Sequence, residues 1–550
     1  MNSPFVCLSC RHITLAARAR HASLTAFRRS YTRPSFAPKP ILDLKHIRHA
    51  PGLYEQNCHD RNHAPQARNS WRILELHEKL VAQQREVVQL RQRSNAIGKE
   101  VGRSADMEGD SDKAAKTALL DEARGLKQQL SGLDAQEKEM QQEMERLALE
   151  MPNLSSLNTP VGDEPQILDL IDERPLNRSA KSHVDIGKQL DILDFEASAT
   201  TSGWGWYFLK NEGALLEQAL IQYALSVAMK RGWRVMTPPS LVYSHIASAC
   251  GFMPRDQNGE TQIYGIAQHE NEHASDRPSL VLTGTAEIPF AGTQANRTLN
   301  SHELPLKVIG PSRCYRAEAG ARGVDTKGLY RVHEFTKVEM FAWTLPNTDS
   351  EGDRFGDDES HSSQADQVFE EMVDIQREIL TSLGLHAKIL EMPTADLGAS
   401  ATRKIDIEAF FPSREAINSG YGEVTSASIC TDYQARRLGT RLKNSSGKLV
   451  WPYTVNGTAM AIPRVLACII ENHWDDVAGV VQIPEVLRQY VPGNIATIQS
   501  PNKSRDCTTI VPWVFGMLHR HHVYTKPEPL HQRYLLSGPC TTIQDARASL

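Results

Sequence analysis

The chain has 550 residues, a formal net charge of −5 and nine cysteines. This length exceeds one ordinary hydrophobic core, so we expect two or more domains. The acidic balance disfavours a protein that coats nucleic acid nonspecifically, and any RNA contact should be confined to a local patch. The single Cys-x-x-Cys, Cys7 to Cys10, has no second pair at metal spacing, so we expect no zinc. Scattered cysteines in odd number fit reduced thiols in a cytosol-like or matrix compartment.

Residues 1–40 have the composition of a mitochondrial transit peptide. Six arginines lie between Arg11 and Arg33, serine, threonine and alanine separate them, and no acidic residue precedes Asp43. The alternative is a disordered basic tail, but such a tail has no reason to exclude acidic residues. We therefore expect import, with processing near residues 28–31. No apolar run is long enough to span a bilayer, which predicts a soluble mature protein without a membrane contact.

Residues 41–155 contain two apolar seams with spacings of three and four, separated by a polar break at 109–111. The first seam is Ile73, Leu76, Leu80, Gln83, Val87, Leu90, Ser94, Ile97 and Val101, and the second is Leu119, Ala123, Leu126, Leu130, Leu133, Glu137, Met140, Met144 and Leu147. We expect two helices in a long antiparallel hairpin. A dimerising coiled coil is the commoner meaning of heptads. Residues 68–103, however, hold eight Lys and Arg against four acidic residues, so one face is able to follow phosphates.

From residue 165 to 495, short apolar segments alternate with helical ones, which predicts an α+β domain on a largely antiparallel sheet flanked by helices. Within it, residues 346–366 are polar and acidic without an apolar period, so we expect a flexible surface insertion there. Residues 496–550 form a C-terminal extension in which we recognise no functional pattern.

Several segments of this domain carry chemically informative residues. In chain order they are RGWRVMTPPS at 231–240, TGTAEIP at 283–289, RCYRAEAG at 313–320, GLYRVHEF at 328–335, KVEM at 337–340, EVTSASICTDYQARR at 423–437 and VNGTAMAIPR at 455–464. Arg316 and Glu318 are two residues apart, and on an extended segment both side chains would face the same side. An arginine beside a carboxylate suits a site that meets a phosphate and an adenine together.

These segments together resemble class II aminoacyl-tRNA synthetases, in the form found in seryl-tRNA synthetases. The resemblance spans roughly residues 43–493. Segment 231–240 is similar to motif 1, segments 313–340 to motif 2, and segments 423–437 and 455–464 to the long strand and helix of motif 3. The resemblance implies a class II catalytic domain preceded by a helical arm. It also implies a homodimer formed through the motif 1 region.

By this resemblance, L-serine is activated by ATP to seryl-adenylate and then transferred to the 3′ end of tRNA(Ser), which the arm at 41–155 binds. The transit peptide places the enzyme in the mitochondrial matrix. One alternative is a catalytically inactive paralogue that binds RNA or protein, which we would expect to lack Arg316, Glu339 or Arg464. A ligase that loads serine onto a carrier protein would lack the arm. Another class II synthetase is disfavoured by the arm together with Thr285 and Thr458.

The family also implies the roles of individual residues. Arg316, Arg464 and Glu423 are the expected catalytic residues, and no side-chain nucleophile or general base is assigned. The expected serine-binding residues are Thr285, Ala286, Glu287, Arg316, Glu339, Asn456 and Thr458. The expected ATP-binding residues are Arg316, Ala317, Glu318, Arg331, Val332, His333, Glu334, Phe335, Glu423, Val424, Thr425, Ser426 and Arg464. Glu423 and Ser426 are the expected ligands of Mg²⁺, an ion that prefers hard oxygen donors.

Overall fold

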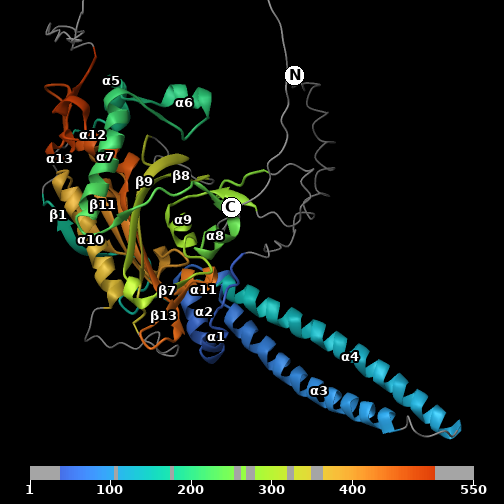
Figure 1. Ribbon diagram of the computed structural model, residues 1–550. Helices are drawn as coiled ribbons and strands as arrows, with labels where there is room; N and C mark the ends of the chain where they lie inside the picture. Colours follow the sequence, from blue (N-terminus) through green and yellow to red (C-terminus); the bar gives the residue numbers. More distant parts are fainter. Residues whose placement is uncertain are drawn as a thin grey trace, which may run out of the picture. The chain divides into compact units, whose positions relative to one another are not determined.

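A computed structural model describes residues 37–103, 110–173, 179–252, 262–267, 279–318, 328–347 and 363–501, all of which belong to one structural unit (Figure 1). Most of the predicted transit peptide and nearly all of the predicted C-terminal extension therefore lie outside the described residues. Ala37 and Pro38, which the predicted transit peptide includes, are buried. The main-chain N–H of Ile41 donates to the carbonyl oxygen of Arg436 at 2.9 Å. Residues 37–40 thus pack with the fold, although the predicted transit peptide includes them.

The N-terminal region is helical, as the seams predicted. Its elements are α1 (Leu44–His49), α2 (Pro51–Asp60), the 3-10 turn η2 (Ala64–Gln66), α3 (Asn69–Arg103) and α4 (Asp110–Leu149). Asp43 caps α1 by accepting a hydrogen bond from the N–H of His46 at 3.0 Å, and Pro51 occupies the first turn of α2. The helices α3 and α4 contact each other along a hairpin (Figure 1).

The predicted seams are the inner faces of this hairpin. Five positions of the first seam are buried in α3, namely Ile73, Leu76, Leu80, Val87 and Ile97. Every predicted position of the second seam is buried or half-buried in α4. Exposed pairs such as Arg93 Nε with Glu122 Oε1, 2.8 Å apart, join the two helices outside the seam. The apolar faces are satisfied within one chain, so the heptads need no second copy for burial.

The catalytic region contains an eight-stranded sheet. In spatial order its strands are β1 (Gln166–Ile171), β10 (Ala387–Glu391), β11 (Arg403–Phe410), β12 (Tyr421–Thr431), β15 (Tyr453–Ala461), β9 (Glu334–Thr344), β8 (Leu306–Tyr315) and β4 (Arg234–Val235). Every neighbouring pair is antiparallel except β4 with β8, which is parallel. This confirms the predicted α+β class with a largely antiparallel sheet.

Both faces of the sheet are covered. Along β9, Val338, Met340 and Ala342 belong to one apolar cluster, and Phe341 and Trp343 belong to another. Because successive residues of a strand point to opposite faces, the two clusters lie on opposite sides of the sheet. The first side carries α5 (His183–Gln189), α7 (Asn211–Met229), α10 (Gln364–Ser382), α12 (Ile462–Asn472) and α13 (Glu485–Arg488), and the second carries α8 (Ser244–Ala249), α9 (Glu287–Gly292) and α11 (Tyr433–Leu438) (Figure 1).

Short elements complete the fold. They are β2 (Leu193–Asp194), α6 (Phe195–Thr201), β3 (Phe208–Leu209), β5 (Leu241–Tyr243), β6 (Leu280–Leu282), β7 (Thr298–Asn300), β13 (Arg441–Lys443), β14 (Leu449–Val450), β16 (Trp474–Asp475), β17 (Val480–Gln482) and β18 (Thr497–Gln499). Strand β18 pairs with β17, and its Ile498 is 1% exposed. The folded core therefore extends past residue 495, where we expected the extension to begin.

The predicted insertion is also shorter than expected at its C-terminal end. Ser363 and Asp366 form a reciprocal capping box at the start of α10, and the side chain of Gln364 accepts a hydrogen bond from the N–H of Leu345 at 2.8 Å. Residues 364–366 belong to α10 and Ser363 is its N-cap, so they are not part of an irregular insertion. The polar composition that we read as a loop is there the signature of a helix N-terminus. Residues 348–362 lie outside the described part.

Candidate active site

A pocket of about 550 Å³ lies where the ends of β8 and β9 meet β12, β15 and α12. Most of the residues expected to bind ATP line it, namely Arg316, Glu318, Arg331, Val332, Phe335, Glu423, Val424, Thr425, Ser426 and Arg464. Ala317, His333 and Glu334 do not line it. Tyr330, Lys337, Thr458, Ala461 and Pro463 complete the wall. Segments more than 100 residues apart in the chain are thus brought together in one cavity.

Arg316 and Glu318 line the same pocket, but they do not lie on an extended strand as expected. Strand β8 ends at Tyr315, and Glu318 has a positive φ of 48°. The alternation of side chains on a strand therefore does not bring the two together, since a left-handed residue follows the strand. The carboxylate of Glu318 lies 3.4 Å from the guanidinium of Arg331 across the hairpin.

Arg464 stands in the first turn of α12 and connects three parts of the pocket. Its Nη1 donates to the carbonyl oxygen of Glu423 at 2.8 Å and lies 3.1 Å from Glu423 Oε2. Its Nε donates to the carbonyl oxygen of Tyr330 at 3.1 Å, and its guanidinium is 4.5 Å from the centre of the Tyr330 ring. The guanidinium of Arg414 lies 4.0 Å from the same ring. Tyr330 is therefore held between two cations.

The Glu423 carboxylate is ionised in this environment. Burial raises its pKa, but the charges of Arg464, Lys404 and Arg316 outweigh burial and lower the pKa to about 2. Glu423 and Ser426, whose side chains end in oxygen, both line the pocket. Mg²⁺ usually takes one or two protein oxygens and completes its shell with waters and substrate phosphates, so these two donors fit that ion. Among the described residues, no group of three or more His, Cys, Asp and Glu is placed to hold a metal by itself.

A second polar site borders the pocket on the β9–β15 pair, where Thr458 stands opposite Glu339 in the strand register. Glu339 is 1% exposed. Its Oε2 accepts a hydrogen bond from Thr458 Oγ1 at 3.3 Å and lies 2.6 Å from Lys337 Nζ. Lys337 was not assigned a role from the sequence. Its only local signal is the spacing of two from Glu339, which places both side chains on one face of β9.

Glu287 belongs to the same polar site. Its Oε2 accepts from Asn456 Nδ2 at 3.2 Å, and its Oε1 accepts from Gln434 Nε2 at 2.5 Å. Burial and the nearby Glu339 carboxylate raise the pKa of Glu287 to about 8, although Lys337 and the Gln434 amide oppose the rise.

The rest of the Thr-x-Glu segment shapes the main chain around Glu287. Thr285 and Ala286 are buried, and Thr285 Oγ1 accepts from the N–H of Glu287 at 3.3 Å. Gln434, the partner of Glu287 in α11, was missed because it lies 147 residues away and no local pattern identifies it.

The residues absent from the pocket wall have other contacts. The His333 ring stacks on Trp206 with centroids 5.9 Å apart, and its Nδ1 lies 3.1 Å from the carbonyl oxygen of Arg316. Glu334 accepts a hydrogen bond from Tyr315 Oη at 3.2 Å.

Within the pocket wall, the Arg316 guanidinium lies 5.3 Å from the centre of the Phe335 ring.

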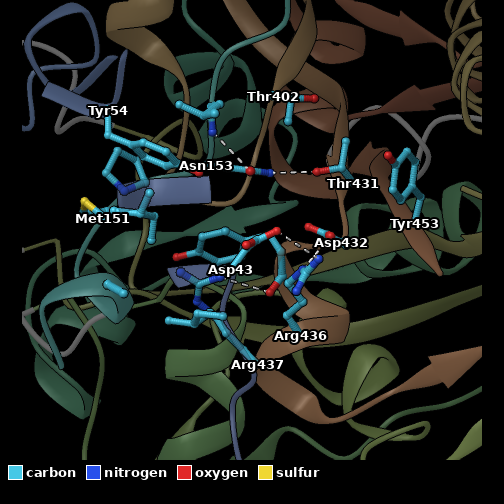
Figure 2. A pocket seen from close by; sticks show the side chains of 16 residues that line it. Asp43, Tyr54, Met151, Asn153, Thr402, Thr431, Asp432, Arg436, Arg437 and Tyr453 are labelled. Carbon is cyan, nitrogen blue, oxygen red and sulfur yellow. Dashed lines mark hydrogen bonds and ion pairs between the residues drawn. The ribbon is translucent and has the colours of Figure 1, made fainter. Parts of the chain in front are cut away.

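A separate pocket, shown in Figure 2, lies between the base of the helical hairpin and the sheet. Asn153 Nδ2 donates to Thr431 Oγ1 at 3.1 Å, and Arg436 Nε is 2.6 Å from Asp432 Oδ2. Nearby, the buried guanidinium of Arg61 donates to the carbonyl oxygens of Asn153 and Gly398. None of the predicted site residues lines this pocket. Its polar contacts join the helical region to the catalytic region.

None of the helices in the described part of the chain has the length and apolar character needed to cross a membrane.

Comparison with known proteins agrees with this architecture. The model of the seryl-tRNA synthetase N-terminal domain matches residues 41–155, and that of the tRNA synthetase class II core domain (G, H, P, S and T) matches residues 270–473. A mitochondrial serine–tRNA ligase of Saccharomyces cerevisiae is 41% identical over 70% of this chain and 80% of its own length. One from Schizosaccharomyces pombe is 37% identical over 84% of this chain and 90% of its own.

A solved structure is similar over the same region. The crystal structure of seryl-tRNA synthetase from Pyrococcus horikoshii complexed with ATP matches 84% of this chain and 100% of its own, with a TM-score of 0.70 and 28% identity.

Proposed function

This chain belongs to the seryl-tRNA synthetase family of class II aminoacyl-tRNA ligases, and from that premise we propose which residues carry out serine activation and transfer. The substrates are ATP, L-serine and tRNA, and the arm at 41–155 is the tRNA-binding element of the family. The serine carboxylate attacks the α-phosphorus of ATP in line, which forms seryl-adenylate and releases pyrophosphate. The seryl group then passes to the 3′ end of tRNA(Ser). No comparison favours the catalytically inactive paralogue.

ATP occupies the pocket lined by Arg316, Glu318 and Arg464. Arg316 neutralises the α-phosphate and the serine carboxylate, because its planar, permanently charged guanidinium binds two oxyanions at once. Glu318 reads the adenine amino group, and Phe335, beneath Arg316, supplies an aromatic face for the base. Arg464, at the start of α12, faces the γ-phosphate, where the helix dipole adds to its charge.

Mg²⁺ is the metal that we propose for this site, held by Glu423 and Ser426 together with ATP phosphate oxygens. When bound, it neutralises phosphate charge and orients the pyrophosphate leaving group. The ionised Glu423 carboxylate supports this assignment, as does its position in the pocket beside Arg464. Val332, Val424 and Thr425 line the same pocket, and Ala317, His333 and Glu334, which we also assign to ATP binding, are next to lining residues in the chain.

Serine is selected by the buried Glu339 and Thr458, and this pair is the observation that carries the substrate assignment. A serine hydroxyl is able to donate to Glu339, whereas alanine and glycine would leave part of the buried carboxylate without a partner. That difference disfavours them by about 1–3 kcal/mol. Glu287, positioned by Asn456 and the Thr285–Ala286 turn, holds the substrate ammonium.

We propose a homodimer formed through the motif 1 region. Strand β4 lies at the end of the sheet, and Val235 and Met236 are exposed there. Leu241 and Tyr243 in β5 are also exposed. An unpaired sheet edge with exposed apolar side chains favours pairing with a second copy.

The mitochondrial matrix is the proposed location of the protein. The similar proteins of Saccharomyces cerevisiae and Schizosaccharomyces pombe are mitochondrial serine–tRNA ligases. The first 36 residues combine six arginines with no acidic residue, which is typical of an import sequence. Cleavage before Ala37 would leave the described fold intact.

The function is tested by amino-acid-dependent pyrophosphate exchange with a chain that begins at Thr32. We expect exchange with serine and none with threonine, alanine or glycine, and its loss in Glu339→Ala. Glu217→Ala is the matched control, because Glu217 is also buried but accepts from Thr336, and neither residue lines the pocket. A folded, ATP-binding preparation that shows no exchange with any of these amino acids would overturn the enzyme assignment and favour the inactive paralogue.

A further inference from the structure

A buried histidine outside the ATP pocket links three separate segments of the catalytic region. His183, the first residue of α5, is 5% exposed. Its Nδ1 lies 2.6 Å from Oε1 of Glu471, which is fully buried in α12. Its Nε2 lies 3.0 Å from the main-chain nitrogen of Leu329, on the chain segment that returns to β9. No local sequence pattern indicates a role for His183, Glu471 or Leu329.

The hydrogen bonds determine where the His183 proton is. The N–H of Leu329 is a donor, so Nε2 must be the acceptor and carries no proton. Nδ1 therefore carries the proton and donates it to Glu471. Glu471 also accepts from the N–H and the hydroxyl of Ser413, at 3.1 and 2.8 Å. Burial raises the pKa of Glu471, but its hydrogen bond with His183 and its other partners lower it overall, so it is an ionised acceptor.

Helix α12, which carries Glu471, also bonds directly to Tyr330, the residue after Leu329. Arg464 and Glu471 are seven residues apart on α12, about two helical turns, so they lie on one face. Arg464 donates to the carbonyl oxygen of Tyr330, while Glu471, through His183, holds the N–H of Leu329. Helix α12 thus holds both ends of a two-residue segment. The next residue, Arg331, lines the ATP pocket.

The His183 ring packs so closely against the main chain at Gly328 that there is no space for a Cβ atom at that position. Gly328, next to Leu329, has a φ of 76°, and a Cβ placed there would lie 2.2 Å from His183 Nε2. Glycine is the residue that tolerates this conformation and this approach. The imidazole is therefore packed against the main chain of 328–329 as well as bonded to it.

We propose that His183 is a positioning residue for ATP, which acts by holding Leu329 so that Tyr330 and Arg331 face the nucleotide. His183 does not line the ATP pocket. This inference rests on the proposed function of that pocket. The hydrogen bonds that join Glu471, His183 and the main-chain N–H of Leu329 fix the position at which residues 329–331 enter the pocket. Its loss weakens ATP binding and leaves the Glu287–Glu339 serine site in place.

The test compares His183→Phe, which keeps a ring but removes both hydrogen bonds, with His183→Gln, which retains an acceptor near the Nε2 position. We expect KM for ATP in pyrophosphate exchange to rise about tenfold or more in His183→Phe, with KM for serine within about twofold of wild type. His183→Gln should recover part of the ATP affinity. A purely structural role would not produce this split or this rescue.

His473→Gln is the matched control. His473 follows the end of α12, and its Nε2 bonds the carbonyl oxygen of Leu383 at 2.8 Å, away from motif 2. It should lower thermal stability without changing KM for ATP. Equal changes in KM for ATP and serine in His183→Phe, or the same ATP defect in His473→Gln, would overturn the proposal.

Failure of the proposed function is distinguishable from failure of this inference. If the wild-type chain shows no serine-dependent exchange, the function fails, and equilibrium binding of ATP to the same variants still measures the effect of His183. Unchanged ATP binding in a folded His183→Phe overturns the positioning role. If His183→Phe does not fold, the ATP affinity of His183→Asn decides, because asparagine keeps a donor near the Nδ1 position but has no acceptor within reach of the Leu329 N–H. An affinity equal to wild type in that variant overturns the proposal.

Discussion

Because we assign Glu287 to the substrate ammonium, its raised pKa predicts that serine binding depends on pH. In the free site burial and Glu339 raise the pKa of Glu287 to about 8, so at pH 7 most of this carboxyl is protonated. A bound ammonium favours the ionised form and displaces the proton. The affinity for serine should therefore increase as pH rises and become constant above the pKa of Glu287 in the free site. Below that pKa, serine binding must also remove a proton from Glu287.

The size of the effect follows from the same value. One pKa unit corresponds to a tenfold change, so the apparent affinity should change about tenfold per pH unit well below pH 8 and about fiftyfold between pH 6 and pH 8. The measurement is KM for serine in pyrophosphate exchange at saturating ATP across this range. In Glu287→Gln, which cannot release a proton, serine binding should be weaker and nearly independent of pH. KM for ATP is the internal control and should not follow this slope.

Two results would refute this reasoning. A KM for serine that stays constant from pH 6 to pH 8 in the wild type would mean that Glu287 is already ionised in the free site. A slope that persists in Glu287→Gln would mean that a different group titrates.

Three further predictions concern other parts of the molecule. Lys337→Met leaves the buried Glu339 carboxylate without its ion partner at 2.6 Å. The free energy of unfolding, measured with denaturant, should fall by about 3–5 kcal/mol. A loss below about 1 kcal/mol would contradict this prediction. Arg61→Met removes a 1% exposed guanidinium that donates to two main-chain carbonyl oxygens and should cost about 3 kcal/mol by the same measurement, so an unchanged midpoint would show that water replaces it. Replacing the exposed Arg85 and Lys99 of α3 with glutamine should weaken tRNA charging and its salt dependence but leave pyrophosphate exchange unchanged; equal charging would remove this face of the arm from the RNA interface.

Much of the architecture was predictable because it depends on local patterns. The seams at 73–101 and 119–147 are repeated spacings, and they proved to be the inner faces of α3 and α4. The strand and helix content of the catalytic region followed in the same way, and its segments 313–340 and 455–464 do form one pocket. The errors occurred at boundaries, as at Ser363 and Ile498, where polar composition and low apolar periodicity were read as loop or tail.

The residues that could not be predicted from the sequence were missed for one physical reason. Tyr330, Gln434 and His183 have roles that depend on partners far along the chain, such as Arg464 for Tyr330 and Glu471 for His183, which is 288 residues away. No periodicity records such a pair, since it exists only after the sheet and α12 have packed.

The sequence by itself determined the helical arm, the class of the catalytic domain and most of the residues that line the proposed ATP pocket, because hydrophobic period and motif spacing are properties of a short stretch of chain. Only the tertiary structure decided how those residues are charged and held. The low pKa of Glu423 arises from the charges of Arg464, Lys404 and Arg316, which outweigh burial, whereas the high pKa of Glu287 arises from burial and from Glu339. The attachment of Leu329 to α12 runs through His183 of α5. Segments distant in the chain supply these neighbours. Electrostatic and hydrogen-bond energies depend on distance in space, and that distance is set by the fold.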